Sequence, residues 1–225
     1  MGFQAESAGV RYENYMASNI PKPTPDDYLI VEDNPLWLST PSPFDTLDSE
    51  WYRIIIFYVF HVPVTGVSAR AKPLDSYGWG SKSKNNDFKR LKKRLIKYSD
   101  ITEEAFRCED GWASLKQAFQ ATDLFVFPTN ITRERVAYRK VKSGESDSLL
   151  SHIRNSFAHG RLSFYANGED VYIAMEDIDN NKHVSARMIV SKRTLLYWKT
   201  IIEAGPFITE EELERTLGEA KNTSH

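Results

Sequence analysis

The hydrophobic periodicity of this chain changes at Gly160. Before this glycine, apolar residues recur at helical spacing in several segments. After it, short runs of β-branched and aromatic residues alternate with turn residues. The later part therefore predicts a small antiparallel sheet, with strands at 162–165, 171–175 and 184–190. We expect a mainly α fold, a helical bundle with a small antiparallel β-hairpin or sheet inserted after the helix that ends at Gly160.

Three segments upstream of this helix are also predicted to be helical. Asp48 can cap a buried helix that runs through Tyr58 and Val59, although the β-branched run at 54–56 keeps a strand possible there. Apolar residues at 88, 91, 95 and 98 lie on one side of an amphipathic basic helix. A further helix is expected at 111–125, before Pro128.

Turn and cap signals divide the chain into three parts. Six of the ten prolines lie between residues 21 and 43, so residues 1–44 are expected to form an extended arm. Residues 45–205 form the compact domain, in which Ser191 caps a helix that ends at Gly205. Residues 206–225 are an acidic helix and tail, opened by a capping box of Thr209 and Glu212.

The composition excludes several kinds of protein. The single cysteine, Cys108, rules out an internal disulfide, and no spaced Cys/His cluster offers a zinc site. The N-terminus lacks a secretory signal, and the apolar run at 54–67 is too short to span a bilayer, so we expect a cytoplasmic protein that does not contact membranes. The net charge is −2, so any nucleic acid must be held by a local patch.

The basic helix supplies the one concentrated positive surface. By default such a surface is a solvated helix face, but its excess of cations also suits backbone phosphates. The residues predicted to bind RNA there are Lys89, Arg90, Lys92, Lys93, Arg94 and Lys97.

The segment at 151–161 carries the residues best suited to chemistry. Helical geometry turns Ile153 and Phe157 toward the core, with Leu149 and Leu150 beside them. Arg154 then lies on one margin of the opposite face, and Asn155 and His159 lie on the other.

Small residues, Ser151 and Ala158, lie between these two margins. An identical helix can approach such a stripe closely, and two-fold packing there would bring each Arg154 near the His159 of a second copy. The chain is therefore expected to form a homodimer.

Histidine and arginine suit cleavage of RNA. Imidazole titrates near ~6.5, so His159 can accept or donate a proton near neutral pH. The guanidinium of Arg154 stays charged and can bind two phosphate oxygens. This chemistry needs neither a metal nor a cofactor.

The phrase Ile153-Arg154-Asn155-Ser156-Phe157-Ala158-His159-Gly160 resembles the motif of the HEPN superfamily, in which four to six residues separate an arginine and a histidine. The likeness extends over about residues 146–204, as in HEPN proteins with a short sheet after the motif. It implies a metal-independent endoribonuclease that leaves a 2′,3′-cyclic phosphate, with Asn155 orienting the histidine or the phosphate. It also implies a place in antiphage defence or a toxin system, and a possible antitoxin or regulatory protein as partner.

One residue departs from that pattern, and other interpretations stay open. HEPN toxins paired with nucleotidyltransferases commonly carry a tyrosine where this chain has Arg161, which we instead expect to contact phosphate. His152 is expected near the site as a neighbour that tunes it and contacts RNA. The main alternative is a non-catalytic HEPN module that binds RNA, a nucleotide or a protein. A third interpretation is a helical scaffold in which the motif helix is buried. A fourth is that Arg154 and His159 are an ordinary pair of polar residues at a helix end.

Overall fold

The computed structural model describes residues 26, 29, 49–61, 64, 70–80, 84–126, 131–142, 144–168 and 170–222. Within these residues the α-helices are α1 (Ser49–Ile55), α2 (Lys84–Lys97), α3 (Trp112–Ala121), α4 (Glu145–Ala158), α5 (Lys192–Ala204) and α6 (Glu210–Asn222). The strands are β1 (Phe106–Glu109), β2 (Arg135–Arg139), β3 (Leu162–Asn167), β4 (Asp170–Ile178) and β5 (Val184–Ser191). Short helical turns are η4 (Ile56–Phe60), η5 (Leu74–Tyr77) and η6 (Glu103–Ala105). The predicted N-terminal arm lies almost entirely outside the described residues.

The prediction of a mainly α fold is wrong, because the chain builds a five-stranded mixed sheet and is an α+β protein. The strand order is β1-β2-β5-β4-β3. Strands β1 and β2 pair in parallel, and the other neighbours are antiparallel. The three strands predicted after Gly160 are confirmed as β3, β4 and β5, but they form only part of the sheet, because β2 adds to the edge of β5.

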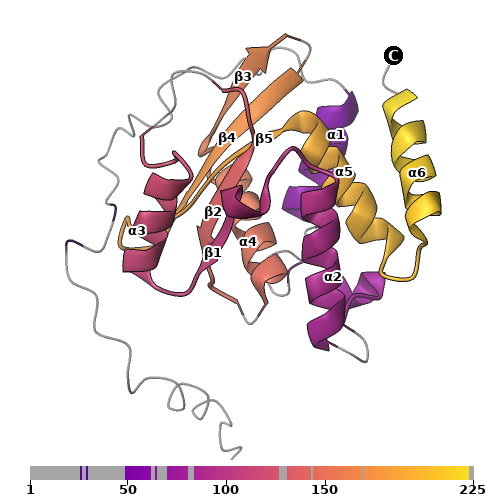
Figure 1. The fold of residues 1–225 in the computed structure, drawn as a ribbon, viewed down its shortest axis with the longest axis horizontal. Helices are drawn as coiled ribbons and strands as arrows, with labels where there is room; N and C mark the ends of the chain where they lie inside the picture. The colour runs from indigo at the N-terminus through magenta and orange to yellow at the C-terminus, as the bar shows by residue number, and fades with distance from the viewer. Residues whose placement is uncertain are drawn as a thin grey trace, which may run out of the picture.

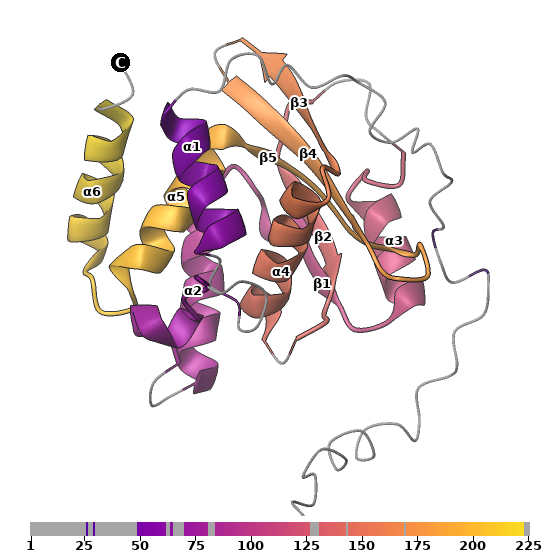
Figure 2. The same cartoon turned by 180° about the vertical axis from the view of Figure 1, so that it is seen from behind.

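Helices cover both faces of the sheet. Figures 1 and 2 show α3 on one face and α1, α2, α4 and α5 on the other. Because successive side chains of a strand point to opposite faces, each central strand contributes residues to the cores on both sides of the sheet. In β4, Ile173 and Met175 join the larger core under the helical layer, and Tyr172 and Ala174 join the smaller core under α3. None of the helices in the described ranges is long and apolar enough to cross a membrane.

The predicted helices are confirmed where periodicity and caps agree. The segment after Asp48 is helical, although it changes from α1 to the π-helical turn η4 at Ile56. The Ser191 hydroxyl accepts a hydrogen bond from the Thr194 N–H at 3.0 Å and caps α5. Thr209 and Glu212 form the expected capping box at the start of α6.

Candidate active site

Helix α4 carries the Arg154 to His159 motif and lies against the sheet. Leu149, Leu150 and Ile153 are fully buried, as their spacing predicted. They pack into the larger core with residues of α1, η4 and the sheet. The helix therefore has a fixed orientation, with its middle buried and only Glu145 at its start and Ala158 at its end exposed.

The stripe of small residues on α4 is not a surface, contrary to the sequence prediction. Ser151 is buried, and its hydroxyl donates to the carbonyl of Asp147 at 2.8 Å. Ser148 is also buried and accepts hydrogen bonds from the N–H groups of Val141 and Lys142. The prediction failed because it assumed a helix packed by one face, whereas both strands and helices surround α4. Of the stripe, only Ala158 is exposed.

A buried network joins α4 to strand β4. The His152 ring is 1% exposed, and its Nδ1 lies 2.6 Å from Asp177 Oδ2. Its Nε2 lies 2.7 Å from the carbonyl oxygen of Arg139, which can only accept, so Nε2 carries a hydrogen. With both nitrogens occupied inside the protein, His152 serves the fold instead of meeting a substrate.

The same network extends to the motif arginine. Asn155 Nδ2 donates to Asp177 Oδ2 at 3.2 Å, and Asn155 Oδ1 accepts from Arg154 Nη1 at 3.1 Å. Both side chains are half-buried. Asn155 therefore orients the arginine, and a carboxylate from β4 orients Asn155.

His159 ends the helix and is exposed. Its N–H bonds to the Asn155 carbonyl at 2.9 Å, and the next residue, Gly160, has φ +65°. The N–H groups of Gly160 and Arg161 then bond back to Phe157 and Ser156, which is the Schellman arrangement of a helix C-terminus. The reversal leaves the imidazole at the surface, at the end of the segment that holds Arg154.

Arg161 lies on the other face of the sheet from the motif. Its guanidinium pairs with the fully buried carboxylate of Glu176, which also accepts from Arg187 Nε at 2.9 Å. Arg187 contacts the ring of Phe119 on α3. The structure therefore separates Arg161 from Arg154 and His159, and gives it a structural partner where we expected a phosphate.

A pocket with a volume of about 310 Å³ opens beside His159. We call it the aromatic pocket, and its principal lining residues are Trp51, Phe60, Phe157, Ala158, Gly160 and Phe164, with further apolar side chains of α1, η4 and β3. The two residues that flank His159 in sequence are among them. The sequence did not predict this pocket, because its walls come from segments about a hundred residues apart that only the fold joins.

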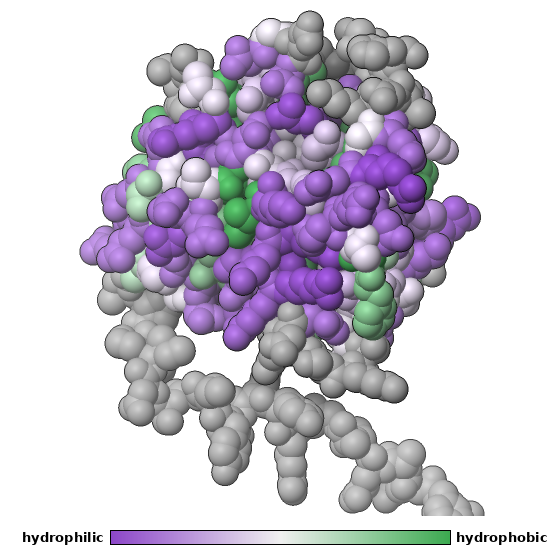
Figure 3. Space-filling model, turned by 45° about the vertical axis from the view of Figure 1, so that its right-hand side comes forward, coloured by the Kyte–Doolittle hydropathy of each residue, from purple (hydrophilic) through white to green (hydrophobic). Residues whose placement is uncertain are grey.

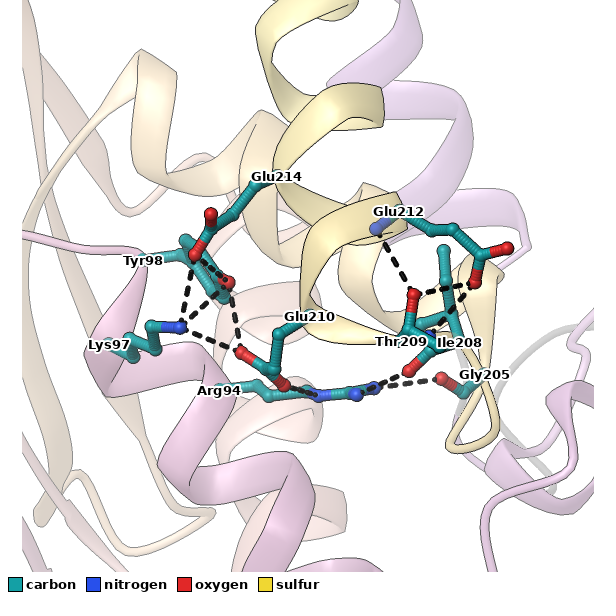
Figure 4. Close-up of polar contacts among 9 residues, drawn as sticks. All are labelled: Arg94, Lys97, Tyr98, Gly205, Ile208, Thr209, Glu210, Glu212 and Glu214. Atoms are coloured by element: carbon teal, nitrogen blue, oxygen red, sulfur yellow. Dashed lines mark hydrogen bonds and ion pairs between the residues drawn. The ribbon is translucent and has the colours of Figure 1, made fainter.

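The basic surface of α2 is partly occupied by the chain's own carboxylates. Arg94 is 3% exposed and donates to Glu210 at 3.0 Å and to the carbonyls of Gly205 and Ile208 (Figure 4). Lys97 contacts Glu210 at 2.8 Å and Glu214 at 3.2 Å.

These contacts change the titration of both partners. The Lys97 ammonium, with help from Tyr98 and Arg94, lowers the pKa of Glu210 to about 2, and the carboxylates raise the pKa of Lys97 well above its ordinary value. Arg94 and Lys97 thus hold α6 on α2.

The remaining cations of α2 differ in accessibility. Lys92 pairs with Glu145 at the start of α4 at 2.8 Å. Lys89, Arg90 and Lys93 are exposed. Figure 3 shows the side of the molecule that carries α2 and α6, and hydrophilic side chains cover most of it. The predicted RNA surface is therefore reduced to Lys89, Arg90 and Lys93, because the other three cations pair with carboxylates.

A reactive cysteine and a cluster of metal-binding side chains are the other kinds of candidate site. Burial raises the pKa of the Cys108 thiol to about 11, which leaves it a weak nucleophile. Within the described ranges, no group of three or more His, Cys, Asp and Glu side chains could hold a metal ion. Arg154, Asn155 and His159 at the end of α4 are the best candidates for a reactive site.

We compared the chain with protein-family models, with curated proteins and with solved structures, and none of the three searches found a match. The likeness to the HEPN motif thus stays a prediction, and function is inferred from the residues and geometry of this chain.

Proposed function

We propose that this chain is a metal-independent endoribonuclease that acts as a homodimer, with Arg154 and His159 as its catalytic residues. The observation that carries the proposal is the contrast at the end of α4. Arg154 is oriented through Asn155 and the buried Asp177, while His159 stands exposed at the helix terminus. Phosphodiester cleavage requires a preorganised charge and an accessible acid–base group.

The proposed reaction uses the 2′-hydroxyl of RNA as the nucleophile. One imidazole takes the 2′-hydroxyl proton while the 2′-oxygen attacks phosphorus. The bond to the 5′-oxygen breaks, and that oxygen receives a proton from the protonated imidazole as it leaves. The products are a 2′,3′-cyclic phosphate and a 5′-hydroxyl. Arg154 offers its planar donors to the phosphate oxygens as negative charge develops there.

We expect the dimer to form through the last turn of α4. The burial of Ser151 blocks the closer packing expected from the sequence, so a second copy can approach only where Ala158 and His159 are exposed. Two such helix ends related by two-fold symmetry bring Arg154 of one protomer toward His159 of its partner. The active site is then composite and is incomplete in a single chain.

The exposed cations of α2 are proposed to guide the RNA strand. They lie on the helix that Lys92 ties to Glu145, at the opposite end of α4 from His159. Fourteen residues of helix separate those ends by about 20 Å. A bound strand therefore extends over several nucleotides. We expect this activity in the cytoplasm, in a defence or toxin system in which an antitoxin or regulatory protein restrains it.

The test is cleavage of a mixed RNA pool in excess EDTA. We expect the wild type to cut, and we expect His159→Ala and Arg154→Ala each to lose about 100-fold or more of the rate, as for removal of an acid–base group or a charge donor. His183→Ala is the matched control, because that histidine lies beside Trp112 of α3 on the other face of the sheet. A folded dimeric wild type that cuts no RNA would overturn the proposal.

A further inference from the structure

The aromatic pocket lies beside the proposed site and is not used by the mechanism. Helix α1 and η4 form one wall, and the end of α4 and the start of β3 form the other. In Figure 2, α1 and α4 lie on the same face of the sheet, and η4 contacts α4. The pocket therefore opens at the helix end that carries His159.

The walls of the pocket are held by ring contacts. Trp51 and Phe164 meet edge to face, with ring centroids 4.7 Å apart. Phe157 is backed by the buried ring of Tyr58, whose centroid lies 6.5 Å away in a stacked arrangement. Phe60 stands at the rim, 45% exposed. A flat aromatic ligand can use both the faces and the edges of such rings.

The pocket selects its ligand by shape and apolar character. All described residues that line it are apolar, and the indole N–H of Trp51 is the one polar side-chain group among them. Its volume of about 310 Å³ lies at the lower end of the range for ligand sites. A single flat group suits this space, and the walls offer few hydrogen bonds to the edge of that group.

We infer that this pocket binds one unpaired nucleobase of the RNA, next to the phosphodiester that is cleaved with His159 as the acid–base group. The inference rests on the proposed function. A base is joined to its phosphate through one ribose, and Ala158 and Gly160, which flank His159, line the pocket. Stacking on aromatic side chains is the common way to hold an unstacked base, and it tolerates any sequence. The substrate class is therefore single-stranded or loop RNA with little base preference.

A double-mutant cycle tests this contact. Binding is measured with His159→Ala protein, so that the RNA stays intact, and with a short unstructured RNA that carries one abasic residue at each position in turn. We expect one abasic position to weaken binding by about tenfold, and Phe60→Ala to weaken binding of the intact RNA by a similar factor. The two losses should not add when variant and abasic RNA are combined. Phe60→Trp should retain the wild-type affinity.

Tyr52→Ala is the matched control, because Tyr52 is an aromatic residue of α1 that is 67% exposed and does not line the pocket. Equal RNA affinity in the Phe60→Ala and Tyr52→Ala proteins would overturn the inference. So would Phe60→Ala protein that binds RNA normally but becomes monomeric, since the pocket would then be a face between copies.

The experiments distinguish an error in the base-binding assignment of the pocket from an error in the proposed ribonuclease activity. If the wild type cleaves RNA but every abasic position is tolerated, the pocket assignment is wrong and the ribonuclease stands. If the wild type cleaves nothing while the cycle shows coupling between Phe60 and one base, the catalytic assignment is wrong and the base site stands.

Discussion

At the scale of single residues, Asp177 organises the candidate site. One oxygen of its carboxylate, Oδ2, contacts both His152 and Asn155, and Asn155 in turn contacts Arg154. The predicted strand ended at residue 175, because Asp177 begins a stretch of Asp and Asn residues that is typical of turns. In the structure Asp177 is paired in strand β4 and is 4% exposed. The motif residues were predictable, but the group that orients them was not.

Replacing Asp177 tests this organisation. Asp177→Ala leaves the buried His152 without its charged partner, and we expect the free energy of unfolding to fall by about 3 kcal/mol. RNA cleavage should fall as well, although no catalytic group is removed. Urea denaturation measures the first effect. Asp110→Ala, which changes a carboxylate whose side chain is 80% exposed, is the control. An Asp177→Ala protein as stable as the control would show that the network contributes nothing.

At the scale of elements, the helices were predictable and two strands were not. Each long helix combines a periodic apolar face with a cap or a stop, which are local signals. Strands β1 and β2 are short and carry charged residues such as Arg107 and Arg135. They exist because each pairs with a partner elsewhere in the chain, and local sequence does not report such pairing.

The attachment of α6 to α2 is expected to make the stability of the fold depend on pH. Glu210 has a pKa of about 2 in the folded protein, below the ordinary 4.5, so its contacts with Lys97 stabilise the fold above pH 4.5 and that contribution is lost as the pH falls toward 2. Because the carboxylate is about half exposed, we expect Glu210→Gln to cost less than about 1 kcal/mol at pH 7.

Urea denaturation between pH 7 and pH 3 measures this difference. The difference in the free energy of unfolding between the wild type and Glu210→Gln should narrow below pH 4.5, where the ion pairs of the wild-type carboxylate begin to contribute less to stability. Glu211→Gln, one residue along the same helix, should follow the wild type throughout. A gap that stays constant across the range would contradict the ion-pair account of α6.

At the scale of the whole molecule, each proposed active site needs residues from two chains. A mixture of Arg154→Ala and His159→Ala proteins tests this without any structure of the dimer. Half of the dimers formed after exchange carry one variant of each kind, and each of these has one intact composite site, so about a quarter of the wild-type activity should return. No recovery in a mixture that demonstrably exchanges subunits would place Arg154 and His159 of each site in one chain.

The chemical identity of the cleaved ends distinguishes attack by the 2′-hydroxyl from hydrolysis by water. A labelled RNA is cut by the wild type in excess EDTA, and its new termini are identified by mass. We expect a 2′,3′-cyclic phosphate and a 5′-hydroxyl, no cleavage where a single 2′-deoxynucleotide replaces the attacking residue, and loss of these products with His159→Ala. Ends with a 3′-hydroxyl and a 5′-phosphate, or cleavage unchanged in His159→Ala, would contradict the proposed mechanism.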